Sequence, residues 1–350
     1  MAVSDRVLIA GGYGVFGRVL ARELLSTTQV DLVLAGRDLR RAEKACRELG
    51  AGERASALRL DLSEPRSLEQ GTAGCFAVAC TAGPFQSLHP GLPAAAVRAG
   101  AHWLDIADLP GWVMRVLADT ALGAAASVAE LAVMPGLSST PTLATVLIDW
   151  CRDRVPGASG ARLTLFIGNR NPKGPAAIAS ALSALSAHPQ AVDLPVGRRI
   201  AYRFDYPGAE TIWGDLGAAM EFRVAFESRL AGRVMASASP FARRLKASER
   251  ARLARWLAIV AAPASRFGSN VGCLQVELWD GAGSSARAAL VGRGQRLAIL
   301  PCALAIEALL SAEPRPRGLV KPAGWLTTQE WLSRLQARGV EFRSHVSSPS

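Results

Sequence analysis

A glycine-rich segment near the start of the sequence constrains the fold more than any other feature. It follows the apolar run at 6–10 and precedes apolar residues at helical spacing over 15–25. In such a strand–turn–helix, the first glycine permits a tight turn and the second lets the backbone approach a pyrophosphate. The third allows close helix packing, so that the helical amides face the anion. The segment predicts a dinucleotide site built on Gly12, Tyr13, Gly14, Val15, Phe16 and Gly17; the alternative is a purely structural turn.

Short apolar runs alternate with helical stretches through this part of the chain. We expect strands at 6–10, 31–35, 57–60, 76–80, 103–106 and 131–134. Asp38 is the expected cap of a second helix, and Ser63 the expected N-cap of a third, with Pro65 in its first turn. Ser138 and Ser139 are the expected N-cap pair of a helix over 141–150. Continuous apolar strands between helices predict a parallel sheet covered on both faces.

The length of the chain fits two domains. We expect an α/β protein whose N-terminal domain, 1–145, is a Rossmann dinucleotide-binding domain with a doubly wound parallel sheet. Residues 146–350 are expected to form a second α+β substrate or dimerisation domain, with C-terminal helices partly packing back on the Rossmann domain. Its predicted strands are 161–167, 272–278 and 286–291, and its predicted helices 297–310 and 329–338.

Composition excludes several classes of function. The net charge of +11 comes from arginines distributed in short pairs without a long basic run, so we expect no nucleic-acid partner. The six cysteines form no C-x-x-C pair and have no histidine at metal spacing, so we expect no metal. The sequence runs directly into a strand without room for a signal peptide. We therefore expect a cytoplasmic protein without membrane insertion, and exposed strands of the second domain are compatible with a homodimer.

Arg37 is the sequence feature that selects between cofactors. In NAD-specific folds, an acidic residue near the end of the second strand binds the ribose hydroxyls. Here Gly36-Arg37 stands at that place, and a guanidinium is suited to a phosphate dianion. Arg37 therefore predicts NADP(H); the alternative is that Asp38 holds the ribose. Asp61, after the third strand, is expected either to contact the adenine or to cap a turn.

The active cleft of a doubly wound sheet lies at the carboxyl ends of its strands. After the fourth strand, we expect the cofactor to meet Thr81, Ala82, Gly83, Pro84 and Phe85. The candidate proton donors are Asp105, Asp108, His89 and Lys173. Each has a structural alternative: the aspartates as strand-end hydrogen-bond acceptors, His89 as a helix-start residue and Lys173 as a solvated loop residue.

Five segments together resemble the saccharopine dehydrogenase-like NADP-binding family. They are 11–17, 35–37, 81–85, 100–105 and 135–139, and they cover the first 150 residues in matching order. The resemblance implies a Rossmann domain followed by an α/β domain whose sheet faces the cofactor. It also implies oxidation or reduction of carbon–nitrogen bonds on amino acids and polyamines with NAD(P).

These observations predict an NADP(H)-dependent oxidoreductase. Hydride would pass to or from a C=N or C=O bond of a small, amino-acid-like substrate. The alternative is an NADP(H)-binding sensor without turnover, because Gly11, Gly14 and Gly17 also fit the G-x-x-G-x-x-G spacing of folds that include redox-sensing regulators. No Tyr-x-x-x-Lys, P-loop or G-x-S-x-G pattern is present, which argues against short-chain dehydrogenase, ATPase and α/β-hydrolase chemistry.

Overall fold

The chain divides into two compact units. The computed structural model describes residues 5–171, 175–206, 208–216, 218–261, 266–311 and 315–348. The first unit comprises Met1–Thr142 and Ala298–Thr327, and the second comprises Leu143–Leu297 and Thr328–Ser350. The C-terminal part of the chain therefore contributes to both units.

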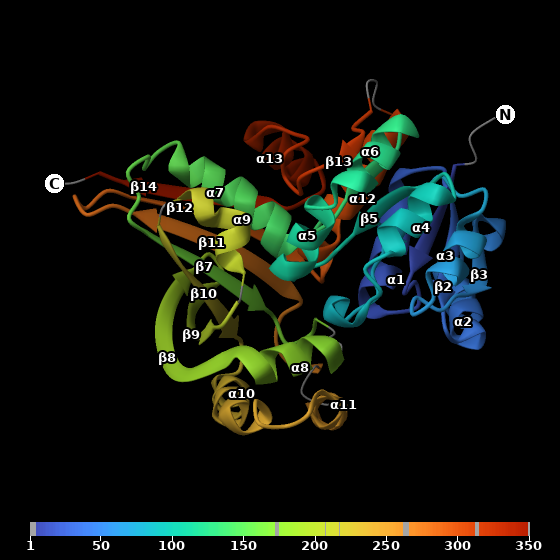
Figure 1. The fold of residues 1–350 in the computed structure, drawn as a ribbon. Coiled ribbons are helices and arrows are strands. Elements are labelled where there is room, and N and C mark those ends of the chain that lie inside the picture. Colours follow the sequence, from blue (N-terminus) through green and yellow to red (C-terminus); the bar gives the residue numbers. More distant parts are fainter. Residues whose placement is uncertain are drawn as a thin grey trace. The chain divides into compact units, whose positions relative to one another are not determined.

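A seven-stranded parallel sheet forms the first unit (Figure 1), in the order β13-β6-β5-β4-β1-β2-β3. Its strands are β1 (Arg6–Ala10), β2 (Asp31–Gly36), β3 (Ala55–Arg59), β4 (Ala77–Cys80), β5 (His102–Asp105), β6 (Ala132–Met134) and β13 (Gly318–Leu319). Its helices are α1 (Val15–Thr27), α2 (Leu39–Leu49), α3 (Pro65–Thr72), α4 (Leu92–Arg98), α5 (Pro110–Leu117), α6 (Thr120–Val128) and α12 (Leu300–Ser311). The order confirms the predicted doubly wound Rossmann sheet.

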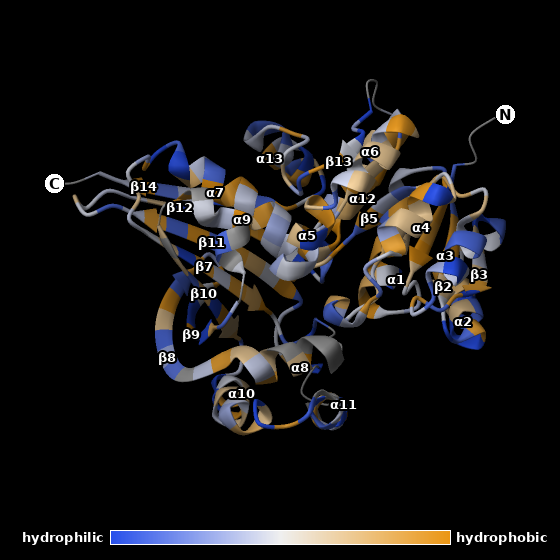
Figure 2. Cartoon of the chain, viewed as in Figure 1, coloured by the Kyte–Doolittle hydropathy of each residue, from blue (hydrophilic) through white to orange (hydrophobic). Residues whose placement is uncertain are grey.

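The core of this unit explains why its strands read as continuous apolar runs. In β1 and β4, every residue from Val7 to Ala10 and from Ala77 to Cys80 is completely buried, as expected for strands covered on both faces. These strands are largely orange in the hydropathy colouring (Figure 2). From the C-terminal part of the chain, α12 packs on α1, where the Thr27 hydroxyl donates to Glu307 Oε1 at 2.6 Å.

Two predicted helix starts differ from the structure. The N-cap of α3 is Glu64, not Ser63, because Asp61 Oδ1 accepts hydrogen bonds from the backbone and hydroxyl of Ser63 at 2.9 and 2.8 Å. The helix predicted from Pro141 begins later. A π-helical turn over Ser139–Leu143 precedes α7 (Ala144–Arg152), and the Ser138 hydroxyl donates to the Ala107 carbonyl.

The second unit contains a mixed seven-stranded sheet in the order β14-β12-β11-β7-β10-β9-β8. Only β7 and β10 pair in parallel; the other neighbours are antiparallel. The strands are β7 (Gly160–Ile167), β8 (Leu185–Leu194), β9 (Gly197–Phe204), β10 (Ala219–Phe226), β11 (Val271–Trp279), β12 (Ser285–Arg293) and β14 (Glu341–Ser347). The helices are α7, α8 (Pro175–Ala184), α9 (Ala209–Trp213), α10 (Arg229–Ala242), α11 (Ala247–Ala261) and α13 (Thr328–Ala337).

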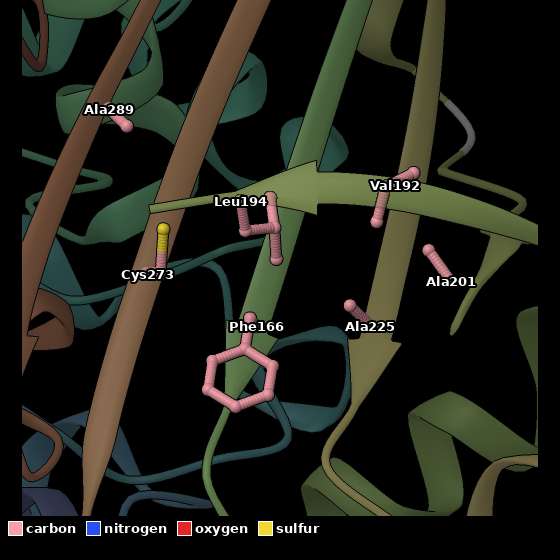
Figure 3. Packing of buried hydrophobic residues seen from close by; sticks show 7 residues of the cluster. All are labelled: Phe166, Val192, Leu194, Ala201, Ala225, Cys273 and Ala289. Carbon is pink, nitrogen blue, oxygen red and sulfur yellow. The ribbon is translucent and has the colours of Figure 1, made fainter. Parts of the chain in front are cut away.

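The end of β8 covers one face of this sheet. Figure 3 shows β8 crossing the sheet, with Val192 and Leu194 near the side chains of the strands below. They share one buried cluster with Phe166 on β7, Cys273 on β11 and Ala289 on β12. An edge strand thus supplies part of the apolar cover that helices supply elsewhere.

Three structural findings bear on the predictions from composition. All six cysteines are free thiols, and five of them are buried. Among the described residues, no group of three or more His, Cys, Asp or Glu side chains is placed to hold a metal ion. Within the same ranges, no helix is long and apolar enough to cross a membrane.

His102 joins two strands of the first sheet. Its ring is 3% exposed, packs against Phe76 with centroids 4.7 Å apart, and accepts a hydrogen bond from the Ala132 amide at 2.9 Å. Burial, with a smaller contribution from the Arg315 charge, lowers the pKa of this imidazole to about 4. The imidazole is therefore neutral in the folded protein at pH 7.

We predict that His102 makes the protein acid-sensitive. The unfolded chain takes up this proton near pH 6.5 and the folded protein near pH 4, so stability is lost as the pH falls between these values. The contribution lost is about 3 kcal/mol. Urea unfolding of His102→Asn, whose amide oxygen can still accept from Ala132, should show a correspondingly smaller loss. His345→Asn, at an exposed site, should follow the wild type; equal losses in all three proteins would contradict the prediction.

Candidate functional site

The glycine-rich loop is tied to the end of β2. The amides of Gly11 and Gly12 both donate to the Ala35 carbonyl, at 2.8 and 3.1 Å. Gly11 has a φ of +79°, a left-handed conformation that favours glycine. The Gly14 amide closes the turn on the Gly11 carbonyl at 2.8 Å. The chain therefore reverses tightly between β1 and α1.

Close packing explains the first and third glycines of the pattern. A Cβ on Gly12 would lie 2.9 Å from the Ile9 carbonyl oxygen, and one on Gly17 would lie 2.7 Å from the Gly12 Cα. Both contacts are with backbone atoms, which cannot move aside as a side chain can. The helix thus approaches the strand more closely than a larger residue would allow.

The N-terminus of α1 is open to an anion. Its N-cap, Gly14, makes no side-chain capping hydrogen bond, and the first turn carries no acidic residue. The first amides of a helix lack intrahelical partners and carry a partial positive charge. Val15 and Phe16 begin the helix and are partly buried. The residues present fit a pyrophosphate at this position.

Tyr13 connects the glycine loop to the arginine-bearing turn after β2. Its ring lies against Gly36, where a Cβ would be 2.9 Å from the ring carbon Cζ, and the Asp38 amide lies 3.4 Å from the hydroxyl. The guanidinium of Arg41 stands 4.8 Å from the ring centroid, a cation–π contact. Sequence analysis missed this role of Arg41, which lies in the first turn of α2, whereas Arg37 precedes the N-cap.

Some charged side chains at this turn make hydrogen bonds within the protein, and others are exposed. Asp38 Oδ1 accepts a hydrogen bond from the Arg41 amide at 3.1 Å, so Asp38 caps α2, as predicted. Arg37 is exposed. Asp61 uses Oδ1 for its hydrogen bonds with Ser63, which lower the pKa of Asp61 together with the charges of Arg37 and Arg59. Arg37 is thus near the ends of both β2 and β3.

The segment after β4 lies beneath the glycine loop. The Thr81 amide and hydroxyl both donate to the Ala10 carbonyl, at 2.9 and 3.0 Å. A Cβ on Gly11 would meet the Ala82 amide nitrogen at 2.9 Å. Gly83 and Pro84 are exposed, whereas the ring of Phe85 is buried against Trp112, with centroids 5.8 Å apart. Of this segment, Ala82, Gly83 and Pro84 retain exposed surface for a ligand.

Asp105 is fully buried at the end of β5 and accepts four hydrogen bonds. The indoles of Trp103 and Trp112 each donate to Oδ2 at 2.9 Å. The amides of Ala107 and Gly136 donate to Oδ1 at 3.0 and 2.9 Å. Burial raises the pKa of this carboxyl, and the four N–H donors oppose that rise. A group that exchanges protons with a substrate must be accessible to it, whereas both oxygens of Asp105 are buried and hydrogen-bonded within the protein.

The remaining predicted donors occupy different environments. Asp108 follows β5 by three residues and is exposed at the carboxyl end of the sheet. His89 is also exposed, but its Nδ1 accepts from the Gly91 amide at 3.0 Å, at the start of α4. Lys173 lies outside the described residues. Asp108 is thus the accessible predicted donor next to a strand end.

We predict that Asp105 acts through structure. In Asp105→Asn, an NH₂ group replaces one acceptor oxygen and faces N–H donors, so about 2–3 kcal/mol of stability should be lost. The matched substitution Asp108→Asn, at an exposed position, should change stability by less than about 0.5 kcal/mol. Urea unfolding measures both values; equal stability of the two variants would contradict this role for Asp105.

Comparisons with known proteins agree with this geometry. A family model described as "Saccharopine dehydrogenase NADP binding domain" matches residues 7–129. Among solved structures, apo saccharopine dehydrogenase (L-Glu forming) from Saccharomyces cerevisiae matches with a TM-score of 0.65 and 13% identity, over 98% of this chain and 100% of that chain. No curated protein matches the sequence.

Short-chain dehydrogenases match a smaller part of the chain. One from Veillonella parvula DSM 2008 in complex with NADP has a TM-score of 0.25 and 22% identity, over 29% of this chain and 46% of that chain. One from Mycobacterium marinum has a TM-score of 0.31 and 18% identity, over 39% and 77%. The glycine loop, the family match and the shared fold agree. Residues 7–129 match the NADP-binding domain of saccharopine dehydrogenases, and the chain shares the fold of saccharopine dehydrogenase.

Proposed function

We propose that the protein is an NADP(H)-dependent oxidoreductase. It transfers hydride to or from a C=N or C=O bond of a small, amino-acid-like substrate. The observation that carries the proposal is the pairing of two anion-binding features: the open N-terminus of α1, and exposed Arg37 on the turn that contacts Tyr13 through Gly36. A dinucleotide with an added 2′-phosphate carries anionic groups suited to both.

The chain's own residues divide the binding of the cofactor between them. The amides at the start of α1 bind the pyrophosphate, and Arg37 binds the 2′-phosphate as a planar, permanently charged donor. Tyr13 fixes the distance between these two places because its ring fills the space over Gly36. Ala82, Gly83 and Pro84 line the cofactor on the β4 side. When bound, the nicotinamide supplies or accepts the hydride.

Asp108 is the proposed proton donor. Hydride addition to the carbon of a C=N or C=O bond leaves an electron pair on nitrogen or oxygen, which then takes a proton. Asp108 follows β5 on the side of the sheet where the strands end, it retains exposed surface, and desolvation raises its pKa, which favours the protonated form that a donor needs. Asp105 is a positioning residue. It accepts hydrogen bonds from the amide of Ala107, which directly precedes Asp108, and from the amide of Gly136, which follows β6.

One observation favours an NADP(H)-binding sensor as a second candidate function. Two of the predicted proton donors make hydrogen bonds within the protein: Asp105 accepts four, and His89 accepts one at the start of α4. A protein that bound NADP(H) without turnover would need no donor at all. The two functions differ in one measurable respect, which is oxidation of bound NADPH by an added imine or carbonyl compound.

We predict that Arg37 selects NADPH over NADH. Replacing it with serine in Arg37→Ser removes charge-assisted hydrogen bonds worth about 1.5–3 kcal/mol, so NADPH affinity should fall about tenfold to a hundredfold. NADH affinity should stay within about twofold, because NADH lacks the 2′-phosphate. Fluorescence titration of the bound nicotinamide measures both, with Arg22→Ser, an exposed arginine elsewhere on α1, as control. Equal losses for both cofactors would contradict the assignment.

We predict that Asp108→Asn separates binding from turnover. A panel of 2-oxo acids with ammonia or amines first identifies a substrate that oxidises NADPH. With that substrate, Asp108→Asn should lower kcat by about a hundredfold or more, with NADPH affinity unchanged. His89→Asn keeps an acceptor for the Gly91 amide and should retain wild-type kcat. Wild-type kcat in Asp108→Asn would refute its role, and tight NADPH binding without turnover across the panel would favour the sensor.

A further inference from the structure

The excess positive charge of the chain is concentrated in one segment of the second unit. Residues 229–266 contain one acidic residue, Glu249, and nine basic ones: Arg229, Arg233, Arg243, Arg244, Lys246, Arg250, Arg252, Arg255 and Arg266. In the rest of the chain, 31 basic and 28 acidic residues nearly cancel. The basic residues form no run in the sequence, but all except partly buried Arg250 are exposed around α10 and α11.

The same segment exposes large apolar side chains. Of the nine large hydrophobic residues exposed in the described part of the chain, six lie between 230 and 267. They are Leu230, Val234 and Phe241 on α10, Trp256 and Ile259 on α11, and Phe267, with exposed fractions of 51–75%. Residues 230, 234 and 241 share one helical face, as do 256 and 259. The two faces together are called the α10–α11 surface.

Packing on α8 explains why these faces remain exposed. Ala242 of α10 and Ala254 of α11 share a buried cluster with Leu182 of α8. Both helices therefore pack on α8 with faces other than the exposed ones. Figure 1 shows α10 and α11 side by side against α8. The helices therefore need no further apolar contact to be held in place, and the exposed Phe, Trp, Ile and Leu side chains have no role within the unit's own core.

From this combination, we propose that the α10–α11 surface binds the surface of an anionic phospholipid membrane. Helices that lie in a membrane interface combine Trp, Phe and Leu side chains with flanking Arg and Lys. Anionic headgroups complement the charge of this segment, and the acyl boundary accepts the apolar side chains. This is peripheral binding, which is compatible with the finding that no described helix can span a membrane.

Two features favour a membrane over the other occupants. A second copy of the chain would bring the same positive charge against itself, which opposes a symmetric contact. An acidic protein would satisfy the arginines, but the apolar side chains are 51–75% exposed and would need a partner of complementary shape to bury them. A lipid surface deforms around projecting side chains and buries them without a complementary shape.

Vesicle flotation of the full chain tests the proposal. We expect binding to vesicles of phosphatidylcholine mixed with phosphatidylglycerol, little binding to phosphatidylcholine alone, and weaker binding as salt rises from about 0.1 M to about 1 M. The triple substitution Phe241→Ser, Trp256→Ser and Ile259→Ser, and separately Arg244→Glu with Arg252→Glu, should each weaken partitioning about tenfold or more. Trp256 fluorescence should shift to the blue, and the shift should be absent in Trp256→Phe.

Matched controls make each result decisive. Val128→Ser removes an exposed apolar side chain on α6, and Arg22→Glu reverses an exposed charge on α1; both should bind vesicles like the wild type. NADPH titration and circular dichroism check that every variant is folded. Absence of binding to anionic vesicles, or binding unchanged by the triple substitution, would overturn the proposal. A wild-type dimer that the triple substitution converts to monomer would assign this surface to a second copy instead.

Discussion

The buried carboxyl of Asp105 is the constraint on which the carboxyl-end geometry of the first sheet depends. Four N–H groups from β5, the loop after it, α5 and the loop after β6 converge on its two oxygens. The backbone adds a fifth connection, since the Leu137 amide donates to the Asp105 carbonyl at 2.7 Å. A buried charge is tolerated only when it is fully hydrogen-bonded, so none of these elements can shift independently. The loops next to the proposed cofactor are therefore held in fixed positions.

The first unit could be predicted from sequence because its strands obey local rules. Continuous apolar runs such as 76–80 are typical of a sheet buried on both faces, and glycine punctuation marks the turns. The local rule for helix caps failed at Ser63, where a neighbouring carboxylate orders the turn before the helix. Ser63 looks like a helix cap in sequence, but Asp61 takes its hydroxyl and amide hydrogens.

The second unit was predicted only in part for a related reason. The predicted strands at 161–167, 272–278 and 286–291 correspond to β7, β11 and β12, which occupy the middle of their sheet. The edge strands β8 and β14 and the interior strands β9 and β10 carry polar and charged residues and went unpredicted. Their place depends on pairing with distant segments, and β-strand preference changes between central and edge positions. The helices α10 and α11 were missed as well, since their mixture of arginine with apolar residues has no simple period in the sequence.

The candidate site shows the same division between local and long-range information. The glycine loop could be predicted because it lies in a local strand–turn–helix pattern, and Arg37 is a candidate because it directly follows the second strand. The roles of the carboxylates could not, because Asp105 is completely buried and Asp108, three residues later, retains exposed surface, while desolvation raises the pKa of both. Which carboxylate is buried depends on Trp112 and Gly136, from two different elements. Sequence therefore predicts where the site lies and leaves the role of each carboxylate open.

The shared fold also limits what similarity can say about chemistry. Saccharopine dehydrogenase from yeast aligns over nearly the whole chain at 13% identity, which shows a shared fold. Substrate choice in such folds is decided by a few side chains on loops, while the scaffold that positions those loops stays the same. In this chain the scaffold contribution is visible in Asp105, Tyr13 and Gly17, whose partners lie within the protein. The side chains left exposed beside them include Arg37 and Asp108, which we propose as the cofactor-selecting and proton-donating residues.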